Sequence, residues 1–544
     1  MPAKFNKMNR ETEKKLSTAN NAKPLSETYR IHRERRRLFI IRSALVGLSA
    51  GFIAVLFQLT LGYAETGREQ LLIILHKDCP YAGWIFLPLI TGTIGAFAGW
   101  LTQRFAPNAS GSGIPHIKGV LVHTRKMSWH RLLPVKFIGG ILSIGSGFSL
   151  GREGPTVQMG AASARAVAGF LRIPRTARNQ LIACGAGAGL AAAFNAPFAG
   201  FIFVIEELRR ELSPLTYSMS IISAVVSVVV TQSILGQGSS FHISGYPMPP
   251  LCALPFFVIL GIWAGLTGVL FNKGLLWLQR KSNKHFRLSL WQKAGIIGIL
   301  IGLAGWWLPE ALGTGHRVAE KVLSGVYATS DMIGFLTLLF IVKFIFTLIS
   351  YITGLPGGIF APMLLLGSLA GLLTGIISSA VFPDISGTPA AYAVAGMASF
   401  FAAVVRAPFT GVVLVLEMTA NYEQLFPLLV SCMVAYIISE RLKTKPIYEA
   451  LLAYDLERNV PKQAIYQEPI LIEVSVEPNS AMDGHKVYEL GLPKGCLIVT
   501  IYRAGKELIP DGGTVLRAGD HVTLVVSGDV ASVSAFINHA CHSC

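Results

Sequence analysis

Apolar segments follow one another from residue 38 to residue 441. After a first segment at about 38–63, further ones lie at about 83–104, 133–148, 153–170, 179–206, 214–236, 251–280, 291–308, 332–353, 360–381, 388–419 and 424–441. A helix needs about 20 apolar residues to cross a membrane, and several segments are shorter or are interrupted by glycine and proline. Irregular backbone at membrane depth survives only where protein buries it or where it lines a cavity. The pattern predicts an all-α polytopic membrane protein with broken and re-entrant helices.

The pattern changes after residue 452. Residues 453–468 carry charges and are predicted to be a linker. The alternation of apolar and polar positions beyond it is typical of half-buried strands, and glycine turns separate them. Residues 469–544 are therefore predicted to form a small cytoplasmic α+β domain. Its predicted strands lie at 472–477, 496–502 and 521–526, and a short helix is predicted at 530–538.

Composition agrees with this division. Of the 544 residues, 52% are hydrophobic and 14% are charged, and the mean hydropathy is +0.53. A soluble protein of this length could not bury so much apolar surface. The seven cysteines are scattered and odd in number, so no disulfide framework is expected.

The net charge of +17 reflects basic residues at the ends of apolar segments. Residues 1–37 form a basic tail that ends in His32-Arg-Glu-Arg-Arg-Arg37. Basic flanks favour the cytoplasmic side of a membrane, so we expect this tail and the N-terminus in the cytoplasm, on the same side as the predicted C-terminal domain. The arginine cluster could also bind anionic lipid headgroups. No basic stripe interleaved with aromatic residues is present, so no nucleic-acid partner is expected.

The segment 148–160 contains the most unusual polar residues of the apolar region. Gly151-Arg-Glu-Gly-Pro155 places a carboxylate between glycines and just before a proline that suits the first turn of a helix. Free N–H groups and the positive end of the helix dipole would then lie at membrane depth. An ionisable side chain at that depth indicates function. The alternative is that Glu153 only forms an ion pair with Arg152.

This segment has a counterpart later in the chain. Residues 147–160 align without gaps on 354–367, and Pro155 falls on Pro362. Likewise 194–200 matches 405–411, and an acid follows each, Glu206 and Glu417. Broken helices at corresponding places in two halves are typical of inverted-repeat transporters, whose substrate lies near the membrane midplane. The predicted repeats span about 38–236 and 251–452.

Four pieces of sequence could meet at one anion. They are Gly111-Ser-Gly-Ile-Pro115, the Glu153 segment, Gly358-Ile-Phe-Ala-Pro362, and Tyr448, which follows Pro446. Hydroxyls and free backbone N–H groups are neutral donors. Such donors can hold a halide weakly enough to release it, which a lysine would not.

These motifs together resemble the CLC family of chloride channels and proton/chloride exchangers over residues 38–452. The resemblance implies a homodimer in a bacterial inner membrane, with an anion pathway in each subunit and no cofactor. It implies that Ser112 and Tyr448 donate hydroxyls to a central chloride, together with the backbone N–H groups of Ile359 and Phe360.

The resemblance also implies an outer anion site formed by the backbone of Arg152, Gly154 and Ala361. Glu153 matches the family's gating glutamate, whose carboxylate competes with the anion and leaves the site when protonated. Because a proton and an anion compete for one place, each biases the binding of the other. The implied function is proton-coupled chloride antiport.

Glu207 separates an exchanger from a channel. By resemblance it is the internal proton-transfer glutamate, and the family's channels typically lack an acid there. Spacing alone leaves another interpretation, in which Glu206 and Glu207 end a helix at the surface beside Arg209 and Arg210. A passive voltage- or pH-gated chloride channel is therefore the alternative function. A membrane enzyme or sensor is a more distant alternative, and it lacks a nucleophile–base pair or metal-ligand set.

Two residues depart from the family pattern. His116 and Lys118 stand where related bacterial exchangers often have acids. Lys118 is then expected to face Lys136 without its usual carboxylate, unless another acid compensates. We expect His116 to be a residue of the helix surface rather than a pH sensor.

The tail resembles the small C-terminal domain of bacterial potassium-uptake regulators (TrkA-C type). The resemblance implies a regulatory domain that binds a small ligand, and a domain that only dimerises is the alternative. His539-Ala-Cys-His-Ser-Cys544 contains soft-metal ligands, but a frayed terminus explains it as well. No metal site is therefore assigned.

Overall fold

The structure is a computed structural model of the chain. It describes residues 25–544 except for 79–80, 210–213, 239, 242–248, 286–287, 460–465, 494, 504–505, 529–532, 534–535, 537–539 and 542–544. The chain divides into two compact units. The first comprises Met1–Leu121 and Met127–Leu451, and the second comprises Val122–Lys126 and Leu452–Cys544.

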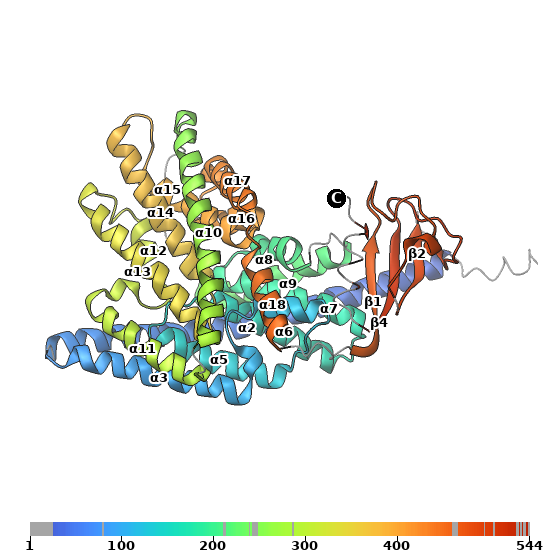
Figure 1. Cartoon of the computed structure of the whole chain (residues 1–544), viewed down its shortest axis with the longest axis horizontal. Helices are drawn as coiled ribbons and strands as arrows, with labels where there is room; N and C mark the ends of the chain where they lie inside the picture. The colour runs from blue at the N-terminus through green and yellow to red at the C-terminus, as the bar shows by residue number, and fades with distance from the viewer. Residues whose placement is uncertain are drawn as a thin grey trace, which may run out of the picture. The chain divides into compact units, whose positions relative to one another are not determined.

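The first unit is helical (Figure 1). Its helices are α2 (Leu25–Asp78), α3 (Gly83–Phe105), α4 (Ile114–Leu121), α5 (Trp129–Gly145), α6 (Glu153–Phe170), α7 (Arg175–Phe194), α8 (Pro197–Phe203), α9 (Pro214–Leu235), α10 (Leu254–His285), α11 (Leu290–Trp307), α12 (His316–Leu323), α13 (Ile333–Ile352), α14 (Phe360–Val381), α15 (Pro389–Val405), α16 (Pro408–Thr419) and α17 (Leu425–Arg441). A π-helical turn, η2 (Val204–Arg209), continues α8, and α18 (Ile447–Asn459) begins at the end of this unit.

Seven helices in the described part of the chain are long and apolar enough to cross a membrane. Large apolar side chains such as Phe52, Trp100 and Leu270 are exposed on them, as they would be against lipid. The predicted all-α polytopic fold is therefore confirmed. Of the basic tail predicted over 1–37, residues 1–24 lie outside the described part, and α2 begins at Leu25.

Two apolar segments that look continuous in the sequence are each two helices. In 179–206, α7 ends at a left-handed Asn195 with φ 56°, and in 388–419, α15 ends at a left-handed Arg406 with φ 70°. A proline two residues later starts α8 and α16, respectively. Proline cannot continue a helix but suits its first turn. Both breaks therefore fall at equivalent positions of the two halves.

Buried lysines show that the repeat reaches further than the aligned motifs. Lys136 Nζ donates to the carbonyl oxygen of Gly111 (2.6 Å) and to that of the residue two places before it (2.9 Å). Lys343 Nζ donates in the same way to Gly313 (2.7 Å) and to the residue two places before it (3.0 Å). The eight-residue helices α4 and α12 follow these two loops. Each half thus holds a glycine loop in place with one buried ammonium.

Close backbone packing also repeats. A Cβ on Gly160 of α6 would collide with the carbonyl of Gly185 in α7, and one on Gly367 of α14 would collide with that of Gly396 in α15. Helices α14 and α15 lie side by side in Figure 1. Small residues permit such contact between membrane helices, where apolar burial adds little.

The second unit contains an antiparallel sheet of order β1-β4-β2-β3. Its strands are β1 (Tyr466–Ser475), β2 (Cys496–Arg503), β3 (Lys506–Leu508) and β4 (His521–Gly528). Buried side chains on one face, including Ile498, Val522 and Leu524, form its core. Helix α18 runs through Asn459, so only 460–465 separate it from β1, and these lie outside the described residues. Of the predicted helix at 530–538, only Val533 and Phe536 are described, and both are helical.

Candidate functional site

Backbone hydrogen bonds hold together the loops that begin α4, α6 and α14. The N–H of Gly151 donates to the carbonyl of Gly358 (2.6 Å), and the N–H of Gly358 donates back to Gly151 (2.8 Å). The N–H of Gly357 donates to the carbonyl of Gly111 (3.2 Å). Three motifs that are far apart in the sequence therefore converge, and they bring three helix N-termini to one place.

Gly154 lies at the centre of this junction. A Cβ at that position would lie 2.7 Å from Ser112 Oγ, 2.8 Å from the Ser112 carbonyl oxygen and 3.1 Å from Gly358 Cα. Ordinary carbon contacts are about 3.5–4.0 Å. Only glycine lets the loop of Ser112, the start of α6 and the start of α14 come this close.

Two buried hydroxyls lie at the same junction. Ser112 is 1% exposed, and Tyr448, the second residue of α18, is fully buried. The two hydroxyls lie close to each other, and neither has a hydrogen-bond partner of normal geometry within the described part of the chain. Buried polar groups are nearly always hydrogen-bonded, so orphaned ones need an explanation. Two neighbouring hydroxyl donors are suited to an anion.

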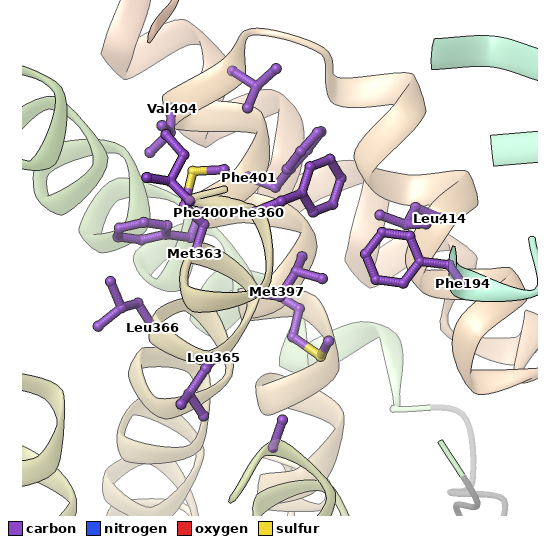
Figure 2. Packing of buried hydrophobic residues seen from close by; sticks show 14 of the residues in the cluster. Phe194, Phe360, Met363, Leu365, Leu366, Met397, Phe400, Phe401, Val404 and Leu414 are labelled. Atoms are coloured by element: carbon purple, nitrogen blue, oxygen red, sulfur yellow. The ribbon is translucent and has the colours of Figure 1, made fainter. Parts of the chain in front are cut away.

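The start of α14 contributes backbone donors. Ile359 caps this helix and Phe360 is its first residue, and both side chains are fully buried. The first N–H groups of a helix have no partner within it. The Phe360 ring packs against Phe194 and Phe401, at centroid distances of 5.2 and 4.6 Å (Figure 2). This packing fixes the start of α14 from the apolar side.

Glu153 is the first residue of α6 and is 2% exposed. Its Oε2 accepts a hydrogen bond from the N–H of Ala361 (3.2 Å), in the first turn of α14. Its Oε1 lies 3.8 Å from Arg152 Nε, which is a looser contact. The carboxylate therefore does more than pair with Arg152, because it occupies an anion position at a helix N-terminus.

Arg152, the chain neighbour of Glu153, lines a cavity of about 780 Å³. Charged residues dominate part of its wall, including Glu65, Arg68, Arg317 and Lys321. Tyr448, in contrast, lies within electrostatic range of both Glu153 and Glu207. The Tyr448 hydroxyl therefore lies near two acids, and Arg152, the chain neighbour of one of them, lines the cavity.

Glu207 is not a surface acid. It lies on the π-helical turn η2 and is 1% exposed. Its Oε1 accepts from Lys118 Nζ (2.6 Å), and the same ammonium lies 3.6 Å from Glu449 Oε1. Of the alternatives that the sequence left open for Lys118, the structure shows compensation by other acids, Glu207 and Glu449. Lys136 is bound to backbone carbonyls instead.

The structure corrects the expectation for His116 as well. The residue is 5% exposed, so it does not lie on the helix surface. Its Nδ1 lies 3.2 Å from Gln158 Nε2, in α6. This contact joins α4 to α6 beside the glycine junction.

Sequence comparison identifies both units. Residues 94–440 match the family described as "Voltage gated chloride channel", and residues 471–538 match the TrkA-C domain. The chain belongs to the voltage gated chloride channel family.

Two relatives from this family are named "H(+)/Cl(-) exchange transporter ClcA". The one from Vibrio parahaemolyticus is 40% identical over 432 residues, which are 78% of this chain and 91% of the relative. The one from Yersinia pestis is 39% identical over 454 residues, 81% and 93% of the two chains. These relatives are transporters.

Solved structures agree. A slow cyanobacterial Cl⁻/H⁺ antiporter matches with a TM-score of 0.73 and 36% identity, over 77% of this chain and 98% of the antiporter. A eukaryotic CLC transporter matches with a TM-score of 0.65 and 24% identity, over 83% and 79% of the two chains, and shares the fold. The protein is accordingly a multi-pass membrane protein of this family.

The sequence pattern did not assign a role to the neighbour of Glu207. Glu206 accepts from the N–H groups of Phe409 (3.2 Å) and Thr410 (2.7 Å), at the start of α16. Glu417 accepts from the N–H groups of α8, at 3.0 and 2.7 Å. Each repeat thus caps a helix of the other, which stabilises free N–H groups and the positive dipole end. The matched acids in the two aligned halves were the only sequence signal of this reciprocal capping.

Proposed function

We propose that this protein exchanges chloride for protons across the membrane. The observation that carries the proposal is the pair of orphaned buried hydroxyls, Ser112 and Tyr448, at a junction of helix N-termini beside the Glu153 carboxylate. Neutral donors and helix dipoles hold an anion without a lysine. The names of the ClcA relatives support chloride and protons as the transported ions.

Coupling follows from competition for one position. The ionised Glu153 accepts from the N–H of Ala361, so a chloride cannot use that donor at the same time. The outer anion site in this proposal is formed by the backbone of Arg152, Gly154 and Ala361. When Glu153 takes a proton, its neutral carboxyl loses its attraction to the helix N-termini and leaves the position to chloride. The Glu153 carboxylate and chloride thus exchange places, and protonation of Glu153 decides which of them occupies the position.

The inner proton path in this proposal begins at Glu207. The central chloride would be held by Ser112 and Tyr448 and by the backbone N–H groups of Ile359 and Phe360. In this proposal the anion site separates the two protonation sites, and the nearness of Tyr448 to both acids supports this arrangement.

Further parts of the proposal concern assembly and orientation. The protein would be a homodimer in a bacterial inner membrane, with 38–452 as the transport domain and both termini in the cytoplasm. The basic residues before the first membrane segment support this orientation. The match to the TrkA-C domain supports a regulatory ligand for residues 469–544. Labelling of single-cysteine variants from either side of the membrane tests the orientation. The mass of the purified protein tests the homodimer.

The function is tested with purified protein in liposomes. A chloride gradient is imposed, the membrane potential is clamped with potassium and valinomycin, and the internal pH and chloride release are followed. We expect protons to move against their own gradient, in the direction opposite to chloride. Chloride flux without proton movement would make the protein a passive channel.

Glu153→Ala is the first variant to measure. We expect chloride flux to persist and proton movement to disappear, because no side chain then carries the proton into the anion site. Glu423→Ala, an exposed acid in the first unit, is the matched control and should behave as wild type. Uphill proton movement by the Glu153→Ala protein would contradict the gating role.

A further inference from the structure

Lys118 lies between two carboxylates of different exposure. The ammonium is 2.6 Å from Glu207 Oε1 and 3.6 Å from Glu449 Oε1. The Glu207 side chain is fully buried, that of Lys118 is 9% exposed, and that of Glu449 is 36% exposed. The three residues come from three separate elements, α4, η2 and the first turn of α18.

We propose that Lys118 and Glu449 form, with Glu207, a proton gate in which Lys118 holds Glu207 ionised and passes to Glu449 when Glu207 takes a proton. This inference rests on the proposed function and deepens it. Lys118 and Glu449 are positioning residues, since they act through Glu207.

The ion pair has to open for a proton to reach Glu207. A buried carboxylate beside an ammonium is stabilised in its charged form, and a proton added to it would leave the ammonium without its closest partner. Glu449 offers that ammonium a second carboxylate, and it is exposed enough to contact water. The lysine ammonium stands on a flexible four-carbon stem, so it can shift from one acid to the other without backbone movement.

Other titratable groups lie on the elements that carry the gate or on α7, which packs against α4 and η2. They are His116 on α4, Glu206 and Arg209 on η2, Tyr448 on α18, and Arg178 and Cys184 on α7. Glu206 is engaged by the N–H groups of α16, and His116 contacts Gln158. Among the described residues, Lys118 forms an ion pair with Glu207.

Opposite shifts in the pH midpoint of proton transport, in a Lys118 variant and a Glu449 variant, distinguish this gate from a merely structural ion pair. In Lys118→Met the buried Glu207 loses its close ammonium, and its neutral form is favoured relative to wild type. Proton transport should then persist to higher pH, with its midpoint raised by roughly one unit or more. In Glu449→Gln, Lys118 has one acid left, so Glu207 is held ionised more firmly. The midpoint should fall, by roughly half a unit because Glu449 is half-exposed.

The experiment measures proton movement and chloride flux of the full chain in liposomes, at equal pH on both sides, from pH 4 to pH 9. Lys118→Arg keeps the charge and should restore a profile near that of wild type. Lys445→Met removes an exposed lysine three residues before Tyr448 and is the matched control. If Lys118→Met does not fold, the acid shift of Glu449→Gln carries the test.

Each outcome decides a different statement. Opposite shifts in the two variants, with chloride flux retained, would establish the gate. The gate would be overturned if the pH profiles of both variants coincided with that of wild type while wild type still exchanged protons for chloride. The proposed function would then remain intact. A wild-type protein that moves no protons would overturn the proposed function itself.

Discussion

Gly154→Ala tests whether the glycine junction builds the anion site. The new methyl group would lie 2.7 Å from Ser112 Oγ, 2.8 Å from its carbonyl oxygen and 3.1 Å from Gly358 Cα. Neither neighbour can move freely. Gly358 donates its N–H to the carbonyl of Gly151 and accepts from the N–H of Gly151, and the Gly111 carbonyl in the loop of Ser112 accepts from the N–H of Gly357. Atoms would have to separate by about 0.5 Å or more to reach normal contact.

Such overpacking costs about 1–3 kcal/mol. The displaced group is the Ser112 hydroxyl, which has no other partner of normal geometry within the described part of the chain, so the cost should appear in anion binding. Every 1.4 kcal/mol is about a tenfold change in an equilibrium constant. We therefore expect the Kd for chloride to rise roughly five- to 150-fold.

Isothermal titration of chloride into chloride-free, detergent-solubilised protein measures this Kd, and a melting curve shows any cost in stability. Gly334→Ala is the matched control, since a Cβ there meets nothing within 4 Å. Wild-type chloride affinity together with a wild-type melting temperature in Gly154→Ala would refute the reasoning, because the methyl would then have found room.

Three further predictions follow from the described contacts. Ser112→Ala and Tyr448→Phe each remove a hydroxyl donor to the anion, and each should weaken chloride binding roughly tenfold and reduce proton coupling; unchanged values in both would place the pathway elsewhere. Glu206→Gln should lower the melting temperature, because the cap of α16 loses its charge at a cost of about 1 kcal/mol, yet leave proton coupling unchanged in the liposome assay. In the second unit, burial raises the pKa of Asp520, but hydrogen bonds from Arg503 at 2.7 and 2.6 Å outweigh it and hold that pKa below its usual range. The pair therefore stabilises at neutral pH, and its contribution is lost as the pH falls through the lowered pKa. Arg503→Met should destabilise this unit by about 2–3 kcal/mol at pH 7 and by less below about pH 4, as hydrogen exchange of the β4 amides in the full chain would show; an equal loss at both pH values would rule out the ion pair as its source.

The sequence by itself determined the membrane fold, the duplication and the positions where α6 and α14 begin. These features depend on local chemistry: apolar length, the fit of proline to a first helical turn, and the freedom of glycine. The absence of lysine from the motifs 111–115, 151–155 and 358–362 indicated weak, neutral binding of an anion in the same way.

Contacts between distant segments were decided only by the tertiary structure. The two breaks at Asn195 and Arg406 lie inside apolar runs, and hydropathy does not register a single left-handed residue. Glu206 and Glu207 are neighbours with the same charge, yet one caps a helix about 200 positions away and the other pairs with Lys118. Neighbours on a helical turn point in different directions. Which partner each acid meets therefore depends on how the repeats pack against each other, and no local pattern contains that information.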